Sequence, residues 1–109
     1  MSDLQNKKCI PCEGGTPLLK HKDIEKLSRE VGESWKVVDD KKIQKEFVFK
    51  DFKEALVFVN TVGALAESEG HHPDIHLFYG KVIIEFWTHA VGGLSENDFI
   101  LAAKINHIT

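Results

Sequence analysis

The chain has 109 residues, of which 42% are hydrophobic and 28% are charged, a composition typical of one globular domain and unlike that of a disordered protein. Its 14 basic and 17 acidic residues give a formal charge of -3, so it lacks the basic surplus of a dedicated nucleic-acid-binding protein. No apolar run approaches the roughly 20 residues that span a bilayer, and the polar N-terminus MSDLQNKK lacks the apolar region of a signal peptide, so we expect a cytoplasmic protein.

Residues 1–20 are predicted to form an irregular N-terminal arm, and residues 21–109 a single domain. Prolines and glycines interrupt the arm at short intervals, as in irregular segments. The arm also contains Cys9 and Cys12 in a C-x-x-C motif. Such a motif supplies a redox pair or half of a zinc site, but two reduced thiols are the simpler interpretation when no secretory signal is present.

The first part of the domain predicts a helix followed by a β-hairpin. Three apolar residues recur at helical spacing within residues 22–33: Ile24, Leu27 and Val31. Residues 35–38 and 43–49 are rich in residues that favour strands, and a charged turn separates them. In the second strand, alternation places three apolar residues on one face: Ile43, Phe47 and Phe49.

A second, longer helix is predicted to begin after Asp51 and to run to about Ser68. Asp51 followed by Glu54 resembles a capping box. The helix carries two apolar stripes, which indicate either a broad core-facing surface or a subunit interface. The first stripe is Phe52, Ala55, Leu56, Val59, Gly63 and Ala66, and the second is Phe58, Val62 and Leu65.

The rest of the chain predicts a second hairpin and a last helix. Gly70 ends the long helix, residues 74–79 and 82–89 alternate like paired strands, and a final helix runs from Ser95 to about His107. Two hairpins make a four-stranded antiparallel sheet, whose apolar face the three helices would cover. The predicted fold class is therefore α+β, in the order α-β-β-α-β-β-α.

Histidine is the most unusual part of the composition, because four of the six histidines fall between residues 71 and 89. His71 and His72 stand in a Gly-His-His-Pro loop, and His89 ends the last predicted strand, which the hairpin folds back toward that loop. Three imidazoles beside one pocket would supply proton donors and acceptors near neutral pH. Surface histidines and a metal site are the alternatives, although adjacent histidines seldom chelate one ion well and alternation directs His76 away.

A longer spacing pattern contains these histidines: Glu67, three residues, His71-His72-Pro73, five residues, Tyr79, nine residues, His89, eight residues, then Asp98-Phe99. This pattern resembles the signature of the pterin-4a-carbinolamine dehydratases, and the resemblance extends over most of the chain. It implies dehydration of 4a-hydroxytetrahydropterin to the quinonoid dihydropterin. That reaction recycles the tetrahydrobiopterin-type cofactor of the aromatic amino-acid hydroxylases, and it implies no metal and no bound cofactor.

The resemblance also implies roles for individual residues. His71, His72 and His89 would be catalytic, with His71 and His89 as general acids and His72 orienting the pterin. The same histidines would contact the substrate. Three further residues would bind it as well: Glu67, Trp87 and Thr88.

Two residues depart from the family's pattern. Ile75 stands where many relatives have an aromatic residue, and Phe99 replaces a tryptophan, but the three histidines are all present. The resemblance further implies three helices on one side of a four-stranded antiparallel sheet, a homodimer or dimer of dimers, and a functional link to an aromatic amino-acid hydroxylase. The alternative is a non-catalytic dimerisation, assembly or transcriptional cofactor on the same fold, and relatives of that kind tend to lose the histidine set.

Overall fold

The computed structural model describes residues 4–7 and 18–108, so the Cys9 and Cys12 motif lies outside the described residues. The predicted α+β order is confirmed. The helices are α1 (His21–Val31), α2 (Phe52–Glu69) and α3 (Glu96–Ile108), and the strands are β1 (Lys36–Val38), β2 (Lys42–Val48), β3 (Asp74–Phe78) and β4 (Lys81–Phe86). Two short 3-10 helices are also described: η1 (Leu4–Asn6) and η2 (His89–Val91).

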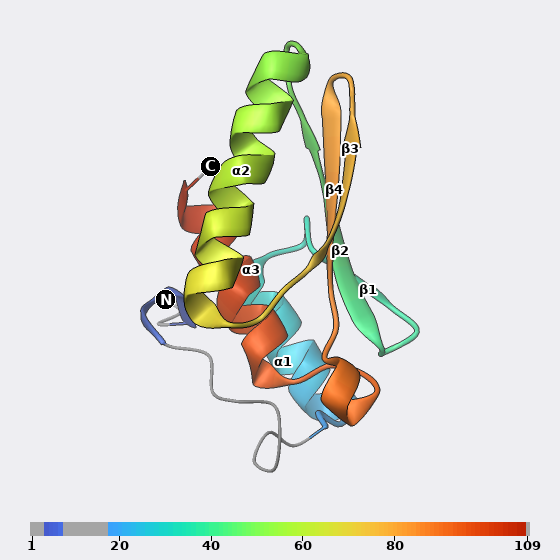
Figure 1. Cartoon of the computed structure of the whole chain (residues 1–109). Coiled ribbons are helices and arrows are strands. Elements are labelled where there is room, and N and C mark those ends of the chain that lie inside the picture. Colours follow the sequence, from blue (N-terminus) through green and yellow to red (C-terminus); the bar gives the residue numbers. More distant parts are fainter. Residues whose placement is uncertain (1–3, 8–17, 109) are drawn as a thin grey trace.

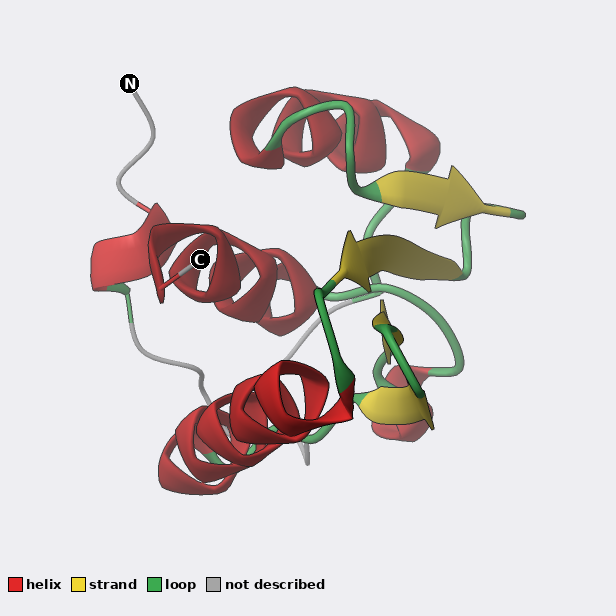
Figure 2. Cartoon of the chain, turned by 90° about the horizontal axis from the view of Figure 1, so that it is seen from above, coloured by secondary structure: helices red, strands yellow, loops and turns green. Residues whose placement is uncertain are grey.

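The four strands form one antiparallel sheet in the order β1-β2-β4-β3. The three α-helices all lie on one face of this sheet (Figures 1 and 2). Alternation along the central strand β4 directs Val82, Ile84 and Phe86 into the core, where each is 0% exposed. The predicted inward face of the second hairpin is therefore confirmed, and the helices exclude water from it.

The N-terminus of α2 is capped as the sequence indicates. The Asp51 carboxylate accepts the Glu54 N–H at 2.9 Å, and this bond satisfies one of the backbone donors that every helix start leaves unpaired. In return, the Glu54 carboxylate accepts the N–H of Lys50 at 3.2 Å, one residue before the position that a standard capping box would use.

The buried face of α2 takes residues from both predicted stripes. It consists of Ala55, Phe58, Val62 and Ala66. Phe52 and Leu56 of the first predicted stripe are 44% and 40% exposed, so neither predicted stripe by itself forms the buried face. The helix packs along the line of Ala55 and Phe58, which leaves Phe52 and Leu56 on its flank. No helix among the described residues, α2 included, has both the length and the apolar character of a membrane span.

A polar contact at the edge of the core joins α3 to the first hairpin. Trp35 is 1% exposed, and its indole N–H donates to Asn106 Oδ1 at 2.9 Å. Lys45 donates to the same oxygen at 3.2 Å, and partial burial lowers the pKa of Lys45. Asn106 in turn donates to the carbonyl of Val31 at 2.8 Å. The indole N–H is therefore paired in spite of its burial, as such donors need to be.

Candidate active site

The C-terminal end of α2 determines where His71 lies. Gly70 has φ 67° and ψ 23°, a left-handed conformation that glycine adopts without strain. Its N–H donates to the carbonyl of Glu67, and the N–H of His71 donates to that of Ala66, both at 3.2 Å. These two bonds make a Schellman motif, and Pro73 prevents further helix. The chain therefore leaves α2 in a direction that places His71 against the core.

The His71 imidazole is held by a buried carboxylate. Its side chain is 6% exposed, and its Nε2 lies 2.6 Å from Oδ1 of Asp98, which is 0% exposed. Because an ionised carboxylate only accepts, Nε2–H is the donor, and Nδ1 is then the proton acceptor of the neutral ring. The ring also stacks on Phe86, with centroids 6.1 Å apart and planes at 10°. Both the tautomer and the orientation of His71 are thus fixed by the fold.

The second oxygen of Asp98 belongs to a chain of buried hydroxyl groups. Oδ2 accepts the Thr88 hydroxyl at 2.8 Å and the Ser95 N–H at 2.9 Å. The hydroxyl groups of Ser95 and Thr88 lie 2.7 Å apart, and since Thr88 donates its proton to Asp98, Ser95 donates to Thr88. Within the described part of the chain, no buried side-chain nitrogen or oxygen lacks a hydrogen-bond partner.

His72 lies on the outer side of the same loop. Its Nε2 is 3.1 Å from Oε2 of Glu67, and the two side chains are 60% and 81% exposed. An ion pair with this exposure contributes little to stability. The contact can instead orient the His72 ring at the surface.

His89 does not end a strand, contrary to the sequence prediction. β4 stops at Phe86 and His89 begins η2, because the N–H of Thr88 bonds to the carbonyl of Gly93 at 2.7 Å and closes a short loop. The exposed His89 ring packs on Trp87, with centroids 3.8 Å apart and planes at 33°. The loop and the indole together hold His89 beside the end of the sheet.

All three predicted catalytic histidines line one pocket of about 290 Å³. His71 and His72 reach it from the end of α2, and His89 reaches it from η2. Trp87 and Thr88 also line the pocket. Glu67 is not among the lining residues, and its side chain is connected to the pocket through its contact with His72.

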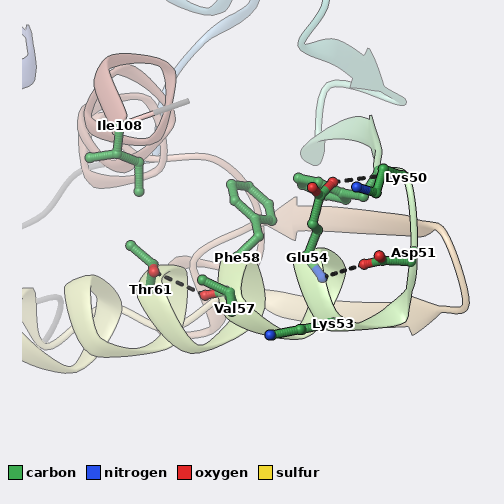
Figure 3. Close-up of a pocket in the computed structure, with 9 residues that line it drawn as sticks. Lys50, Asp51, Lys53, Glu54, Val57, Phe58, Thr61 and Ile108 are labelled. Atoms are coloured by element: carbon green, nitrogen blue, oxygen red, sulfur yellow. Dashed lines mark hydrogen bonds between the residues drawn. The ribbon is translucent and has the colours of Figure 1, made fainter.

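A larger pocket, of about 690 Å³, lies between the first half of α2 and the end of α3. Figure 3 shows Val57, Phe58 and Thr61 of α2 on one side and Ile108 on the other. Its lining contains no histidine. The smaller pocket is the better candidate for acid–base chemistry, because side chains that exchange protons near neutral pH gather there.

The other histidines lie outside the candidate site: His21, His76 and His107. His21 contacts Asp40 at 2.8 Å and Glu25 at 2.6 Å, and the hydrogen bond and charge of Asp40, together with the charge of Glu25, raise the pKa of His21. His76 contacts Glu85 at 3.2 Å. Across residues 4–7 and 18–108, no group of three or more His, Cys, Asp or Glu side chains is placed to hold a metal ion.

Asp98 is the residue whose importance the sequence reasoning missed. The spacing pattern contains it, but its predicted place in the first turn of the last helix suggested only a favourable charge there. Asp98 does accept the N–H of Ser95 near the start of α3, while its other oxygen accepts from His71. The fixed separation of Asp98 from His89 in the pattern was the only available signal of a further role.

The fold and the site together define a class: small α+β domains with several imidazoles around one pocket. The family pattern described as "Pterin 4 alpha carbinolamine dehydratase" matches residues 17–108. A protein of Alkaliphilus metalliredigens named "Putative pterin-4-alpha-carbinolamine dehydratase" is 51% identical over 106 residues, which are 97% of this chain and 96% of the relative. The chain therefore belongs to the pterin-4a-carbinolamine dehydratase family.

Solved structures have the same fold. A transcriptional coactivator/pterin dehydratase from Brucella melitensis superposes with a TM-score of 0.77 at 30% identity, over 84% of this chain and 98% of its own. A pterin dehydratase-like protein identified as a RuBisCO assembly factor in the alpha-carboxysome gives a TM-score of 0.58 at 24% identity, over 72% and 92% of the two chains. The second likeness concerns the fold alone.

Proposed function

We propose that this protein is a dehydratase that removes water from a 4a-hydroxytetrahydropterin and releases the quinonoid dihydropterin. One observation carries the proposal: His71, His72 and His89 border a single pocket. Membership of the family supports the choice of substrate. In this proposal the protein acts in the cytoplasm without metal or bound cofactor and recycles the tetrahydrobiopterin-type cofactor of an aromatic amino-acid hydroxylase.

The proposed reaction requires one proton to be delivered and another to be removed. The bond between C4a and the hydroxyl oxygen breaks, and the hydroxyl leaves as water after taking a proton from an imidazolium. The electron pair of the neighbouring ring nitrogen, N5, forms the new double bond to C4a, and the N5 proton passes to a neutral imidazole. Histidine suits both steps because it exchanges protons near neutral pH.

The proposed roles follow from the environment of each ring. His71 and His89 act as general acids toward the two faces of the hydroxylated carbon. The Asp98 carboxylate, 2.6 Å from His71 Nε2, stabilises the imidazolium form electrostatically and holds the ring in place, as a carboxylate does in other acid–base sites. His72 orients the pterin and, as a neutral imidazole, takes the N5 proton, while Glu67 positions His72 from 3.1 Å away.

The test is the dehydration rate of enzymatically generated 4a-hydroxytetrahydropterin with metal-free protein. We expect the wild type to exceed the spontaneous rate, and His71→Ala and His89→Ala to lose most of that excess. His76→Ala is the matched control, because His76 lies outside the pocket and is exposed. A wild-type rate equal to the spontaneous rate would contradict the proposal, and activity that is lost on chelation and restored by a metal would contradict the metal-free mechanism.

We also propose that the protein forms a homodimer or a dimer of dimers. The supporting observation is the apolar flank of α2, where Phe52 and Leu56, one helical turn apart, are 44% and 40% exposed. Burying these side chains against another chain would remove apolar surface from water. Light scattering should give a multiple of the monomer mass for the wild type and a smaller mass for Leu56→Glu, whereas a monomeric wild type would contradict assembly.

The alternative is a non-catalytic assembly or coactivator role on the same fold. The same apolar flank of α2 favours it, because exposed apolar patches commonly mark protein contacts. The dehydration assay distinguishes the two functions, because only the dehydratase should exceed the spontaneous rate. An inactive wild type that still associates through the Leu56 surface would favour the alternative.

A further inference from the structure

The backbone of Thr88 is fully used within its own loop. Its N–H donates to the carbonyl of Gly93 at 2.7 Å, and its carbonyl accepts the N–H of Gly92 at 3.0 Å and that of Val91 at 3.2 Å. These bonds close the loop that begins with His89. The position of the His89 ring therefore depends on Thr88 through the main chain.

The side chain of Thr88 is engaged as well. The residue is 1% exposed, its hydroxyl proton goes to Asp98 at 2.8 Å, and its oxygen accepts the Ser95 hydroxyl at 2.7 Å. A substrate group that took the Thr88 proton would leave a buried carboxylate short of a donor, which is costly. The hydroxyl is thus placed to serve Asp98 and not a ligand.

We infer that Thr88 is a positioning residue that holds two catalytic histidines in place, and that its hydroxyl does not contact the pterin. Through Asp98 the hydroxyl fixes His71, and through the loop the backbone fixes His89. The catalytic consequence rests on the proposed dehydratase function, whereas the hydrogen-bond arrangement does not. For the Thr88 side chain, this inference replaces the substrate-binding role that the family resemblance implies.

The loss of this hydroxyl should loosen His71 without changing the surface that meets the pterin. With Thr88 replaced by Val, Oδ2 of Asp98 would keep only the Ser95 N–H, and the carboxylate could turn away from its present direction. Displacement of a reacting group by about 1 Å costs on the order of 100-fold in rate. We therefore expect kcat to fall and KM to stay nearly constant.

The kinetic test uses four variants. Thr88→Val should lower kcat about 10- to 100-fold with little change in KM, and Thr88→Ser, which keeps the hydroxyl, should restore kcat. Ser95→Ala, which spares the Thr88 hydroxyl, should lower kcat only a few-fold. Thr61→Val is the matched control, because Thr61 is exposed and bonds only within α2 to the carbonyl of Val57. A raised KM with unchanged kcat in Thr88→Val or Ser95→Ala, or an unchanged kcat in a folded Thr88→Val, would overturn the inference.

A spectroscopic test on substrate-free protein separates this inference from the proposed function. Nitrogen NMR of ¹⁵N-histidine-labelled protein should show His71 protonated at Nε2, with a slowly exchanging, low-field proton, in the wild type and in Thr88→Ser. The signal should broaden or disappear in Thr88→Val that circular dichroism shows to be folded. An identical signal in that variant, or a wild-type proton on Nδ1 alone, would refute the positioning role. A wild type without dehydratase activity would instead refute the proposed function and leave this measurement valid.

Discussion

Replacement of Asp98 by Asn would test whether the buried carboxylate sets the proton positions of His71. Asp98 accepts three hydrogen bonds, from His71 at 2.6 Å, Thr88 at 2.8 Å and the Ser95 N–H at 2.9 Å. An Asn side chain of the same shape has one accepting oxygen and one donating amide. Two of the three donors converge on Oδ2, so the Asn oxygen should take that side and the amide should face His71.

The consequence of Asp98→Asn for His71 can be worked out from this geometry. Nε2 must then accept, and the neutral ring must carry its proton on Nδ1, which is the opposite tautomer from that of the wild type. Such an inversion lowers kcat on the order of 10⁴-fold in a comparable Asp–His pair. The hydrogen bond to a charged group, which contributes about 1.5–3 kcal/mol, is replaced by a neutral one that contributes about 0.5–1.5 kcal/mol. The difference of about 1–1.5 kcal/mol lowers Tm by about 4–12 °C for a domain of this size.

The assay for Asp98→Asn combines kcat, thermal unfolding by circular dichroism and the histidine nitrogen spectrum. Asp23→Asn is the control for kcat and for the histidine spectrum, because Asp23 is exposed on α1 and should change neither. If Asp98→Asn kept the wild-type kcat, Tm and His71 tautomer, the argument that the buried carboxylate controls this ring would be wrong.

Two further predictions concern stability. Gly70→Ala should lose about 1–2 kcal/mol of unfolding free energy, because Gly70 has φ +67°. Gly63→Ala inside α2 should instead gain about 0.5–1 kcal/mol, because an added Cβ there has nothing within 4 Å. Equal Tm values for the two variants would contradict this. Asp40 raises the pKa of His21 in the folded protein, so the contact stabilises the fold while His21 is protonated. This stabilisation is complete below the pKa of His21 in the unfolded chain, about 6.5, and is lost as pH rises through the pKa in the folded protein. Between about pH 6 and pH 8 the wild type should therefore lose more stability than Asp40→Asn, and parallel pH curves would count against the His21 contact.

Local signals account for most of the fold that the sequence predicted correctly. Asp51 at the start of α2 and Gly70 at its end act through backbone groups only a few residues away. Alternation in β4 likewise depends on the geometry of one strand, and it correctly directed Ile84 and Phe86 into the core. Such features are predictable because the chain neighbours that produce them are always present.

Features that depend on how elements pack were harder to predict. The direction in which α2 faces the sheet decided that Ala55 is buried and Phe52 is exposed, although both are apolar and lie on one predicted stripe. In the same way, the bond between Thr88 and Gly93 ended β4 early and moved His89 into η2. In each case several local arrangements satisfy the pattern, and contacts between elements choose one.

The sequence by itself determined the element order, the α+β class and the three histidines that border the candidate pocket, because periodicity, capping and residue spacing are properties of the linear chain. Only the tertiary structure showed that Asp98 lies 2.6 Å from the Nε2 of His71 and that the Thr88 hydroxyl is turned toward that carboxylate. These groups are separated by up to 27 residues. Their contact exists because α3 packs beside the end of the sheet, where burial makes the pairing of each polar group obligatory.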